Sequence, residues 1–201
     1  MKIGIYGGTF DPPHNGHVRA CQCFLEAIEM DKLYIIPTSI PPHKVKKSDV
    51  GGEERLEMAK LAFSGLSDKI EFSRVELDRV GKSYTSDTLK HFKALGVTEI
   101  YLFCGTDMFV TFDTWHEFEY IFDVATVVCM RRENDDYFTD LIAKKALEYK
   151  RKYNARLEFI DEAPIEVSSS DIRDGIAVSE AVQIPDSVAK FIKERGLYKD
   201  E

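Results

Sequence analysis

Two histidines, His14 and His17, are the residues of this chain whose type and spacing most clearly indicate chemistry. They end a stretch rich in glycine and proline, Gly7-Gly8-Thr9-Phe10-Asp11-Pro12-Pro13-His14-Asn15-Gly16-His17. Their i, i+3 spacing places them on the same side of a first helical turn. There, imidazole N–H groups can hold a phosphate and stabilise charge that grows on it during transfer. One histidine is more often structural, but two at a glycine-rich turn predict a functional site.

The turn itself has the features of a phosphate-binding loop. Gly7 and Gly8 allow the backbone to approach a ligand closely, and the helix that follows offers N–H groups and a positive dipole end. The turn contains neither G-x-G-x-x-G nor G-x-x-x-x-G-K-[ST]. A conventional dinucleotide-binding dehydrogenase and a Walker-type ATPase are therefore disfavoured.

A second cluster of polar residues lies near the other end of the chain, in Val167-Ser168-Ser169-Ser170-Asp171-Ile172-Arg173. Three hydroxyl groups and an arginine stand at an expected helix start. Serine is a common helix N-cap, so a purely structural role is the simple alternative. Arginine, however, is well suited to neutralise phosphate charge.

Alternating strands and helices are expected to position these residues. Short β-branched or aromatic runs predict strands at residues 2–6, 33–36, 70–73, 100–104, 124–130 and 157–160. Helical spacing appears between them, in Val18, Cys21, Leu25 and Ile28, in Leu56, Ala59 and Phe63, and in Leu89, Phe92 and Leu95 with Gly96 as the expected C-cap. This alternation favours an α/β fold with a Rossmann-like, doubly wound parallel sheet, in which ligands bind at the carboxyl ends of strands.

The length and composition fit one domain over residues 1–201, with a small helical part at the C-terminal end. A polar stretch at 131–153 predicts a surface helix preceded by a loop, and Val188, Phe191 and Ile192 form the apolar face of a last helix at 187–195. No apolar run is long enough to span a membrane, and no signal peptide precedes the first strand, so we expect a cytoplasmic protein. The four cysteines are expected to be reduced and mostly buried.

The charge of the chain bears on its partners. A formal net charge of −8 argues against polymeric nucleic acid, which normally binds to a basic face. A small anionic ligand needs only a local positive pocket. The one compact basic stretch, residues 43–47, includes Lys44 and is a candidate phosphate contact, although a solvated charge run is an equal alternative.

The two polar stretches resemble the two signatures of the HxGH nucleotidyltransferase superfamily. His14-Asn15-Gly16-His17 matches the first, and residues 167–173 match I-S-S-T-x-I-R with Val167 for Ile and Ser170 for Thr. The resemblance implies a Rossmann-like fold of the nucleotidyltransferase type. It also implies that ATP is bound by Gly7, Gly8, Thr9, Phe10, Gly16, His17, Gly105, Asp107, Ser168, Ser169, Ser170 and Arg173.

Within the superfamily, the middle of the chain resembles the bacterial nicotinate-nucleotide adenylyltransferases. The matching stretches are Ile35 to Lys44 with its P-P-H-K loop, Ser83 to Leu89, Phe103 to Asp107, Thr114 to His116, and Arg131-Arg132. The resemblance implies that nicotinate mononucleotide contacts Thr38, Ser39, Lys44, Tyr84, Thr85, Trp115, His116 and Arg131. Trp115 would stack on the nicotinate ring, although a core or surface packing role is the usual one for a lone tryptophan.

This resemblance implies direct in-line transfer of AMP from ATP to nicotinate mononucleotide, with pyrophosphate as the leaving group. His14, His17, Lys44 and Arg173 are the expected catalytic residues, and Mg²⁺ is expected to bridge the phosphates of ATP without a carboxylate cage of its own. Three alternatives stay open: an adenylyltransferase for another phosphorylated acceptor, nicotinamide mononucleotide or phosphopantetheine, a non-catalytic nucleotide-binding module, and an aminoacyl-tRNA synthetase fragment. The sequence leaves the oligomeric state undetermined.

Overall fold

The strands of the protein form one parallel sheet in the order β3-β2-β1-β4-β5-β6. The structure is a computed structural model that describes residues 1–41, 48–130, 136–162, 165, 167–177 and 183–198. Within these ranges the strands are β1 (Lys2–Gly8), β2 (Lys32–Pro37), β3 (Ile70–Phe72), β4 (Glu99–Gly105), β5 (Thr126–Met130) and β6 (Arg156–Ile160). All five neighbouring pairs are parallel. The carboxyl ends of the strands therefore meet at one edge of the sheet.

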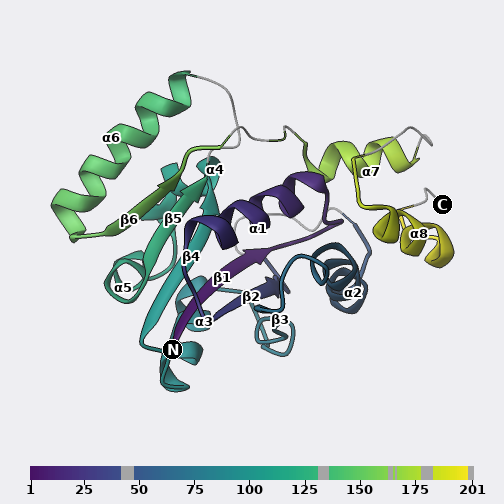
Figure 1. Cartoon of the computed structure of the whole chain (residues 1–201), viewed down its shortest axis with the longest axis horizontal. Helices are drawn as coiled ribbons and strands as arrows, with labels where there is room; N and C mark the ends of the chain where they lie inside the picture. Colours follow the sequence, from purple (N-terminus) through teal and green to yellow (C-terminus); the bar gives the residue numbers. More distant parts are fainter. Residues whose placement is uncertain (42–47, 131–135, 163–164, 166, 178–182, 199–201) are drawn as a thin grey trace.

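Helices cover both faces of the sheet, as a doubly wound fold requires (Figure 1). The residues of α1 (Asn15–Ala27), α2 (Gly52–Phe63), α7 (Ser169–Ala177) and α8 (Asp186–Arg195) pack into the core on one face. The opposite face is covered by α3 (Thr85–Ala94), α4 (Thr106–Val110), the 3₁₀ helix η1 (Phe112–Thr114), α5 (Phe118–Val124) and α6 (Asp136–Tyr153). In Figure 1, α7 and α8 lie together beyond α2, on the side away from α6.

Alternation along the central strands explains the two cores. In β1, Ile3 and Ile5 pack into the core beside α3, whereas Tyr6 belongs to the core beside α1. Both isoleucines are at most 2% exposed. Each such side chain stabilises the fold by roughly 1.5–3 kcal/mol through removal of apolar surface from water.

The predicted fold class is confirmed, and the six predicted strands are all present. The fifth is shorter than predicted, because its expected first residue, Val124, is the last residue of α5. Gly96 has a φ of +81° just after the C-cap of α3, as expected for a residue that ends a helix in the left-handed region. That residues 1–201 form a single domain stays a prediction.

Other features of the fold bear on the predictions from composition. The four cysteines are free and buried. Burial raises the pKa of the Cys21 thiol to about 12. None of the helices in the described ranges is long and apolar enough to cross a membrane.

The order of the strands places a topological switch point between β1 and β4. The chain winds from β1 towards β2 and β3 on one side and from β4 towards β5 and β6 on the other. The loops after β1 and β4 therefore diverge above the middle of the sheet, where open α/β proteins bind their ligands. The stretches after these two strands contain His14, His17 and Asp107.

Candidate functional site

His14 and His17 fix each other at the start of α1. His14 is the N-cap, and its Nδ1 accepts a hydrogen bond from the backbone N–H of His17 at 3.3 Å. In return, the Nδ1 of His17 accepts from the N–H of His14 at 3.2 Å. The two rings stack with their centroids 3.7 Å apart. This reciprocal capping box holds both imidazoles in one orientation, with His14 buried and His17 partly exposed.

Gly16, between the histidines, allows the two signature stretches to meet. A Cβ at this position would lie 2.9 Å from Cγ1 of Val167 and 3.1 Å from the ring of His14. Val167 comes just before α7, so a side chain at position 16 would push α7 away from the start of α1. Close packing of α7 against the start of α1 therefore requires glycine at position 16.

Arg173 and Ser169 of α7 bind the backbone of the loop after β1. The Arg173 Nη1 donates to the carbonyl oxygen of Asp11 at 2.5 Å, and the Ser169 hydroxyl donates to that of Pro12 at 3.0 Å. The Arg173 Nη2 also donates to Ser170. The structure therefore brings together residues that the sequence placed more than 150 positions apart.

Ser168 has the structural role that the sequence left open for it. Its hydroxyl oxygen accepts from the N–H of Asp171 at 3.2 Å, as an N-cap of α7 does. The hydroxyl also lies 2.7 Å from the Asp171 carboxylate. Ser168 thus stabilises the helix that positions Ser169, Ser170 and Arg173.

Asp11 is a buried member of this site that sequence analysis quoted without giving it a role. Its side chain is 6% exposed, and its carboxylate accepts hydrogen bonds from the hydroxyls of Ser48 at 2.7 Å and Tyr198 at 2.8 Å. Burial and the neighbouring carboxylate raise the pKa of Tyr198. The loop after β1 is thereby tied to the C-terminal end of the chain, a contact that no local pattern could indicate.

The start of α1 offers fewer N–H groups than the sequence suggested. The N–H of Asn15 donates to the carbonyl of Gln183 at 2.9 Å, and that of His17 is capped by His14. Two of the first three N–H groups of the helix are thus engaged within the protein. The expectation of a freely available helix N-terminus is corrected to this extent, and the histidine side chains become the more important donors.

A buried arginine from α2, Arg55, joins the ends of β1 and β2. It is 5% exposed, and its Nη1 lies 2.7 Å from the carbonyl oxygens of both Thr9 and Thr38. Burial lowers the pKa of Arg55, an effect opposed by the nearby carboxylate of Asp11. Sequence analysis did not single out Arg55, because it lies in an ordinary charged helical segment.

A buried carboxylate, Glu76, organises the region beyond β2. It is 6% exposed, accepts from the Thr88 hydroxyl at 2.9 Å, and is also hydrogen-bonded to the side chains of Ser83 and Thr38. Burial raises the pKa of Glu76, and the hydrogen bonds and Arg79 oppose that shift. The Ser83 hydroxyl in turn accepts from the N–H of Ser39 at 3.1 Å. This network fixes the predicted residues Thr38 and Ser39.

Aromatic side chains lie near the start of α3 and after η1. Tyr84 is the N-cap residue of α3, Thr85 is its first residue, and the ring of Tyr84 packs against that of His116 at 4.3 Å. Trp115 is partly buried and stacks on Phe112, with ring centroids 4.6 Å apart and an interplanar angle of 11°. Phe112 therefore fixes the plane of the indole.

Of the remaining predicted site residues, some lie in the described part of the chain and two lie outside it. Gly7 and Gly8 end β1, Thr9 and Phe10 follow them, and Gly105 ends β4. Asp107 is exposed in the first turn of α4, where Gly105 rather than Asp107 is the N-cap. Lys44 and Arg131 lie outside the described residues. The described residues contain no group of three or more His, Cys, Asp or Glu placed to hold a metal ion.

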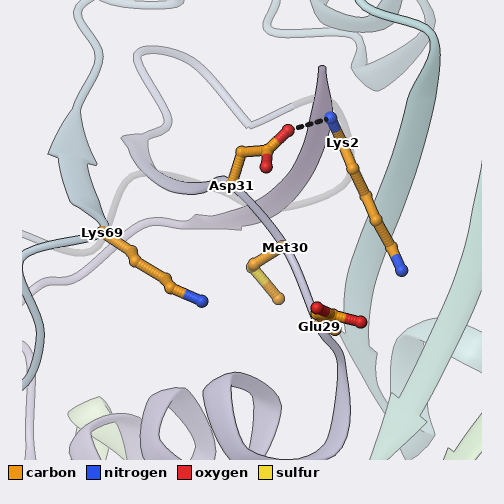
Figure 2. Close-up of a pocket in the computed structure, with 5 residues that line it drawn as sticks. All are labelled: Lys2, Glu29, Met30, Asp31 and Lys69. Atoms are coloured by element: carbon orange, nitrogen blue, oxygen red, sulfur yellow. Dashed lines mark hydrogen bonds between the residues drawn. The ribbon is translucent and has the colours of Figure 1, made fainter.

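The hollow in Figure 2 is on another part of the molecule. It is lined by Lys2, Glu29, Met30, Asp31 and Lys69 (Figure 2). Lys2 begins β1, and Asp31 and Lys69 immediately precede β2 and β3, so the hollow lies at the amino ends of the strands. It is therefore at the edge of the sheet opposite to the candidate site.

Comparison with known proteins gives consistent similarities over the whole chain. The profile of the cytidylyltransferase-like family matches residues 5–175. Proteins named "Probable nicotinate-nucleotide adenylyltransferase" are 34% identical in Clostridium tetani and 35% identical in Bacillus licheniformis, with 98% of this chain and 99% and 98% of the relatives covered. A Plasmodium falciparum nicotinic acid mononucleotide adenylyltransferase, solved in complex with NaAD, has a TM-score of 0.74 at 19% identity, over 98% of this chain and 97% of that one. The last similarity shows the fold.

Proposed function

Because this chain belongs to the cytidylyltransferase-like family and, within it, to the nicotinate-nucleotide adenylyltransferases, we propose that it transfers AMP from ATP to nicotinate mononucleotide. The products are nicotinate adenine dinucleotide, a precursor of NAD, and pyrophosphate. The observation that carries the proposal is the meeting of the two signatures, in which Arg173 and Ser169 bind the loop that leads to His14 and His17. The guanidinium of Arg173 and the imidazoles of His14 and His17 are thus proposed to act together near the switch point of the sheet.

The reaction is an in-line displacement. An oxygen of the acceptor 5′-phosphate forms a bond to the α-phosphorus of ATP, and the bond from that phosphorus to the bridging oxygen breaks. The electron pair leaves with pyrophosphate. Since the attacking phosphate is already ionised at neutral pH, the protein has only to position the two substrates and stabilise charge.

The hydrogen bonds of His17 determine what its ring can do. Its Nδ1 accepts from a backbone N–H, so that nitrogen carries no proton and the proton of the neutral ring is on Nε2. The Nε2–H is then a donor for an oxygen of the α-phosphate. His14, by the same argument, has its proton on Nε2. Neither imidazole is in a state that favours removing a proton, which fits a reaction without a general base.

We name the region that holds ATP the donor side. It consists of the loop after β1 together with α7 and the start of α4. Arg173 neutralises the charge of the leaving pyrophosphate, and the serines before it hold the triphosphate by hydrogen bonds. Asp107, after the carboxyl end of β4, is proposed to accept from ribose hydroxyls, and Gly105 to lie beside the nucleotide. Arg173 binds the loop after β1, and 14% of its side chain is exposed, so we propose that it contacts the phosphates of ATP as well as the loop.

We name the other region the acceptor side. It contains Thr38 and Ser39 after β2, the start of α3, and the segment that carries Trp115 and His116. Tyr84 and Thr85 lie where a nicotinate carboxylate can meet backbone N–H groups at a helix start. Trp115 supplies an aromatic face for the ring. Lys44 and Arg131 are proposed as phosphate contacts on the grounds of sequence.

ATP is expected to bind with a divalent metal ion, which we propose is Mg²⁺. The described polar side chains near the loop after β1 are mainly hydroxyls, imidazoles and two guanidinium groups, whereas Mg²⁺ is usually held by carboxylates and phosphates. The single buried carboxylate there, Asp11, already accepts from two hydroxyls. The ion would therefore be held by the phosphates of ATP and would offset part of their charge. The four free thiols support a cytoplasmic location.

Release of pyrophosphate by the purified protein with MgATP tests this function. Nicotinate mononucleotide, nicotinamide mononucleotide and phosphopantetheine are compared as acceptors, with an assay lacking acceptor as the control. We expect strong preference for nicotinate mononucleotide. Activity with only another acceptor would contradict the substrate but preserve the transfer chemistry. Lack of activity with all three would favour a non-catalytic nucleotide-binding module.

A further inference from the structure

The strands β1 and β2 separate just where their two loops begin. The last hydrogen bond between them joins the N–H of Thr38 to the carbonyl of Gly8 at 2.9 Å. Beyond it, the carbonyl groups of Thr9 and Thr38 are bound by Arg55, whose Nη1 lies 2.7 Å from each oxygen. One nitrogen of α2 thus holds the first residues of both diverging loops.

We propose that Arg55 is a positioning residue that fixes the distance between the donor side and the acceptor side, and thereby the alignment of the two reacting phosphates. This inference rests on the proposed function, in which Thr9 belongs to the loop that holds ATP and Thr38 to the loop that holds the acceptor. Arg55 contacts neither substrate. Its effect passes through two backbone carbonyls, so it acts through the geometry of the loops.

Burial and rigidity make the contact strong. Arg55 is 5% exposed, so its two hydrogen bonds are shielded from water, and hydrogen bonds from a charged donor are stronger than those between neutral groups. The helix that carries it is anchored by Met58, Ala59 and Phe63, none of them measurably exposed. A displacement of either loop would therefore strain a hydrogen bond to a side chain whose helix is packed in the core.

The charge of Arg55 is balanced within the donor side. Asp11 is the carboxylate whose charge acts on Arg55 most strongly, and the carboxylate of Glu54 contributes less. Lysine cannot reproduce the planar guanidinium at this site, because its ammonium is a compact group on a flexible stem. Arg55→Lys therefore keeps the charge and removes the fixed geometry.

The consequence should appear in turnover rather than in the binding of either substrate alone. Each loop keeps its own ligand contacts when the link between the loops is loosened. In-line transfer, however, depends on the relative position of both substrates, and a misplacement of about 1 Å can cost about 100-fold in rate. A residue that served only stability would lower the amount of folded enzyme and leave the kinetics of the folded fraction unchanged.

The test compares Arg55→Lys and Arg55→Gln with the wild type in the pyrophosphate assay, with the thermal midpoint measured for each. We expect kcat to fall about 10- to 100-fold per folded enzyme in Arg55→Lys. KM for ATP and KM for nicotinate mononucleotide should each change less than about threefold. Arg74→Lys is the matched control, because Arg74 is exposed and paired with Glu53 and Asp78. It should keep wild-type kinetics.

Two outcomes would overturn the inference: wild-type kcat in both Arg55 variants, or a large change confined to one KM. If the variants are unstable, calorimetric binding of ATP and of nicotinate mononucleotide to the folded fraction decides the matter. Near-normal affinities with slow transfer support the inference, and lost affinity for one nucleotide contradicts it. Failure of the proposed function would show instead in the wild type, and the same comparison would then use the acceptor that reacts.

Discussion

Contacts on the donor side join residues from opposite ends of the chain, whereas the hydrogen bonds described on the acceptor side span at most 44 positions. Asp11 is bound by Ser48, Arg173 and Tyr198, which are 37, 162 and 187 positions away. Glu76 is bound by Thr88, Ser83 and Thr38, which are 12, 7 and 38 positions away. None of these contacts reaches the C-terminal part of the chain.

The difference in sequence separation distinguishes the region proposed to bind ATP from the region proposed to recognise the acceptor. The donor side needs the complete fold, because α7 and the C-terminal end of the chain must return to the loop after β1. The segment from Glu76 to Thr88 is joined to the residues that follow β2 by the hydrogen bonds of Ser83 with Ser39 and of Glu76 with Thr38. Changes in that segment can therefore alter the recognition of the acceptor while the contacts that hold ATP stay in place.

The largest expected effect is on the donor side. His17→Ala removes the Nε2 donor, and we expect kcat to fall by about two to three orders of magnitude. The lost capping hydrogen bond should reduce the free energy of unfolding by about 1 kcal/mol, too little to unfold the protein. Steady-state kinetics and thermal unfolding measure the two effects separately.

The control for this variant is His91→Ala, which removes an exposed histidine from the last turn of α3. Its turnover should equal that of the wild type. Near-normal turnover in His17→Ala would show that the donor side does not act through His17 and would remove the main support for the catalytic site.

A smaller effect, of a different kind, is expected on the acceptor side. Trp115→Ala removes the aromatic face, and we expect KM for nicotinate mononucleotide to rise about tenfold, which corresponds to about 1.4 kcal/mol of lost binding. KM for ATP should stay within about twofold. Initial rates with each substrate varied at saturation of the other give both constants.

Trp115→Phe is the matched variant, since it keeps an aromatic ring above Phe112. It should restore most of the affinity for nicotinate mononucleotide. An equal rise of both KM values in Trp115→Ala would contradict the separation of the two sides, because it would show that the tryptophan affects ATP as well.

Sequence patterns predicted the fold well because buried parallel strands and amphipathic helices leave periodic signals. Every predicted strand is present, and the error at residue 124 arose because an apolar residue at a helix end extends an apolar strand pattern. The two histidines and Arg173 were also found from sequence, since they occur in compact motifs. The loop after β1 and α7 could each be recognised from sequence, but the contact between them depends on the fold.

The residues that sequence analysis missed share a physical reason. Arg55 and Glu76 have charged side chains in segments that look solvent-exposed, yet both are nearly buried. Burial of a charge depends on partners that only the folded chain supplies, here backbone carbonyls for Arg55 and hydroxyls for Glu76. No spacing along the chain distinguishes them from surface residues. The roles of Lys44 and Arg131 remain predictions from sequence.

The smallest expected effect concerns the pH dependence of stability on the acceptor side. Burial raises the pKa of Glu76 above its ordinary value of 4.5, so the folded protein holds this proton more tightly than the unfolded chain does. The contribution of Glu76 to stability is therefore greatest below pH 4.5 and is lost as pH rises through the raised pKa. Glu76→Gln is neutral at every pH and should lack this decline.

The measurement is the free energy of unfolding of both proteins from pH 4 to pH 8, by denaturant titration. The stability of the wild type relative to Glu76→Gln should fall with increasing pH, by about 1.4 kcal/mol for each unit by which the pKa is raised. Glu29→Gln, which replaces an exposed carboxylate in the same way, is measured as the control. A constant difference between the wild type and Glu76→Gln would mean that the hydroxyls and Arg79 fully offset the cost of burial. The acceptor side would then hold the Glu76 carboxylate in its charged form without loss of stability.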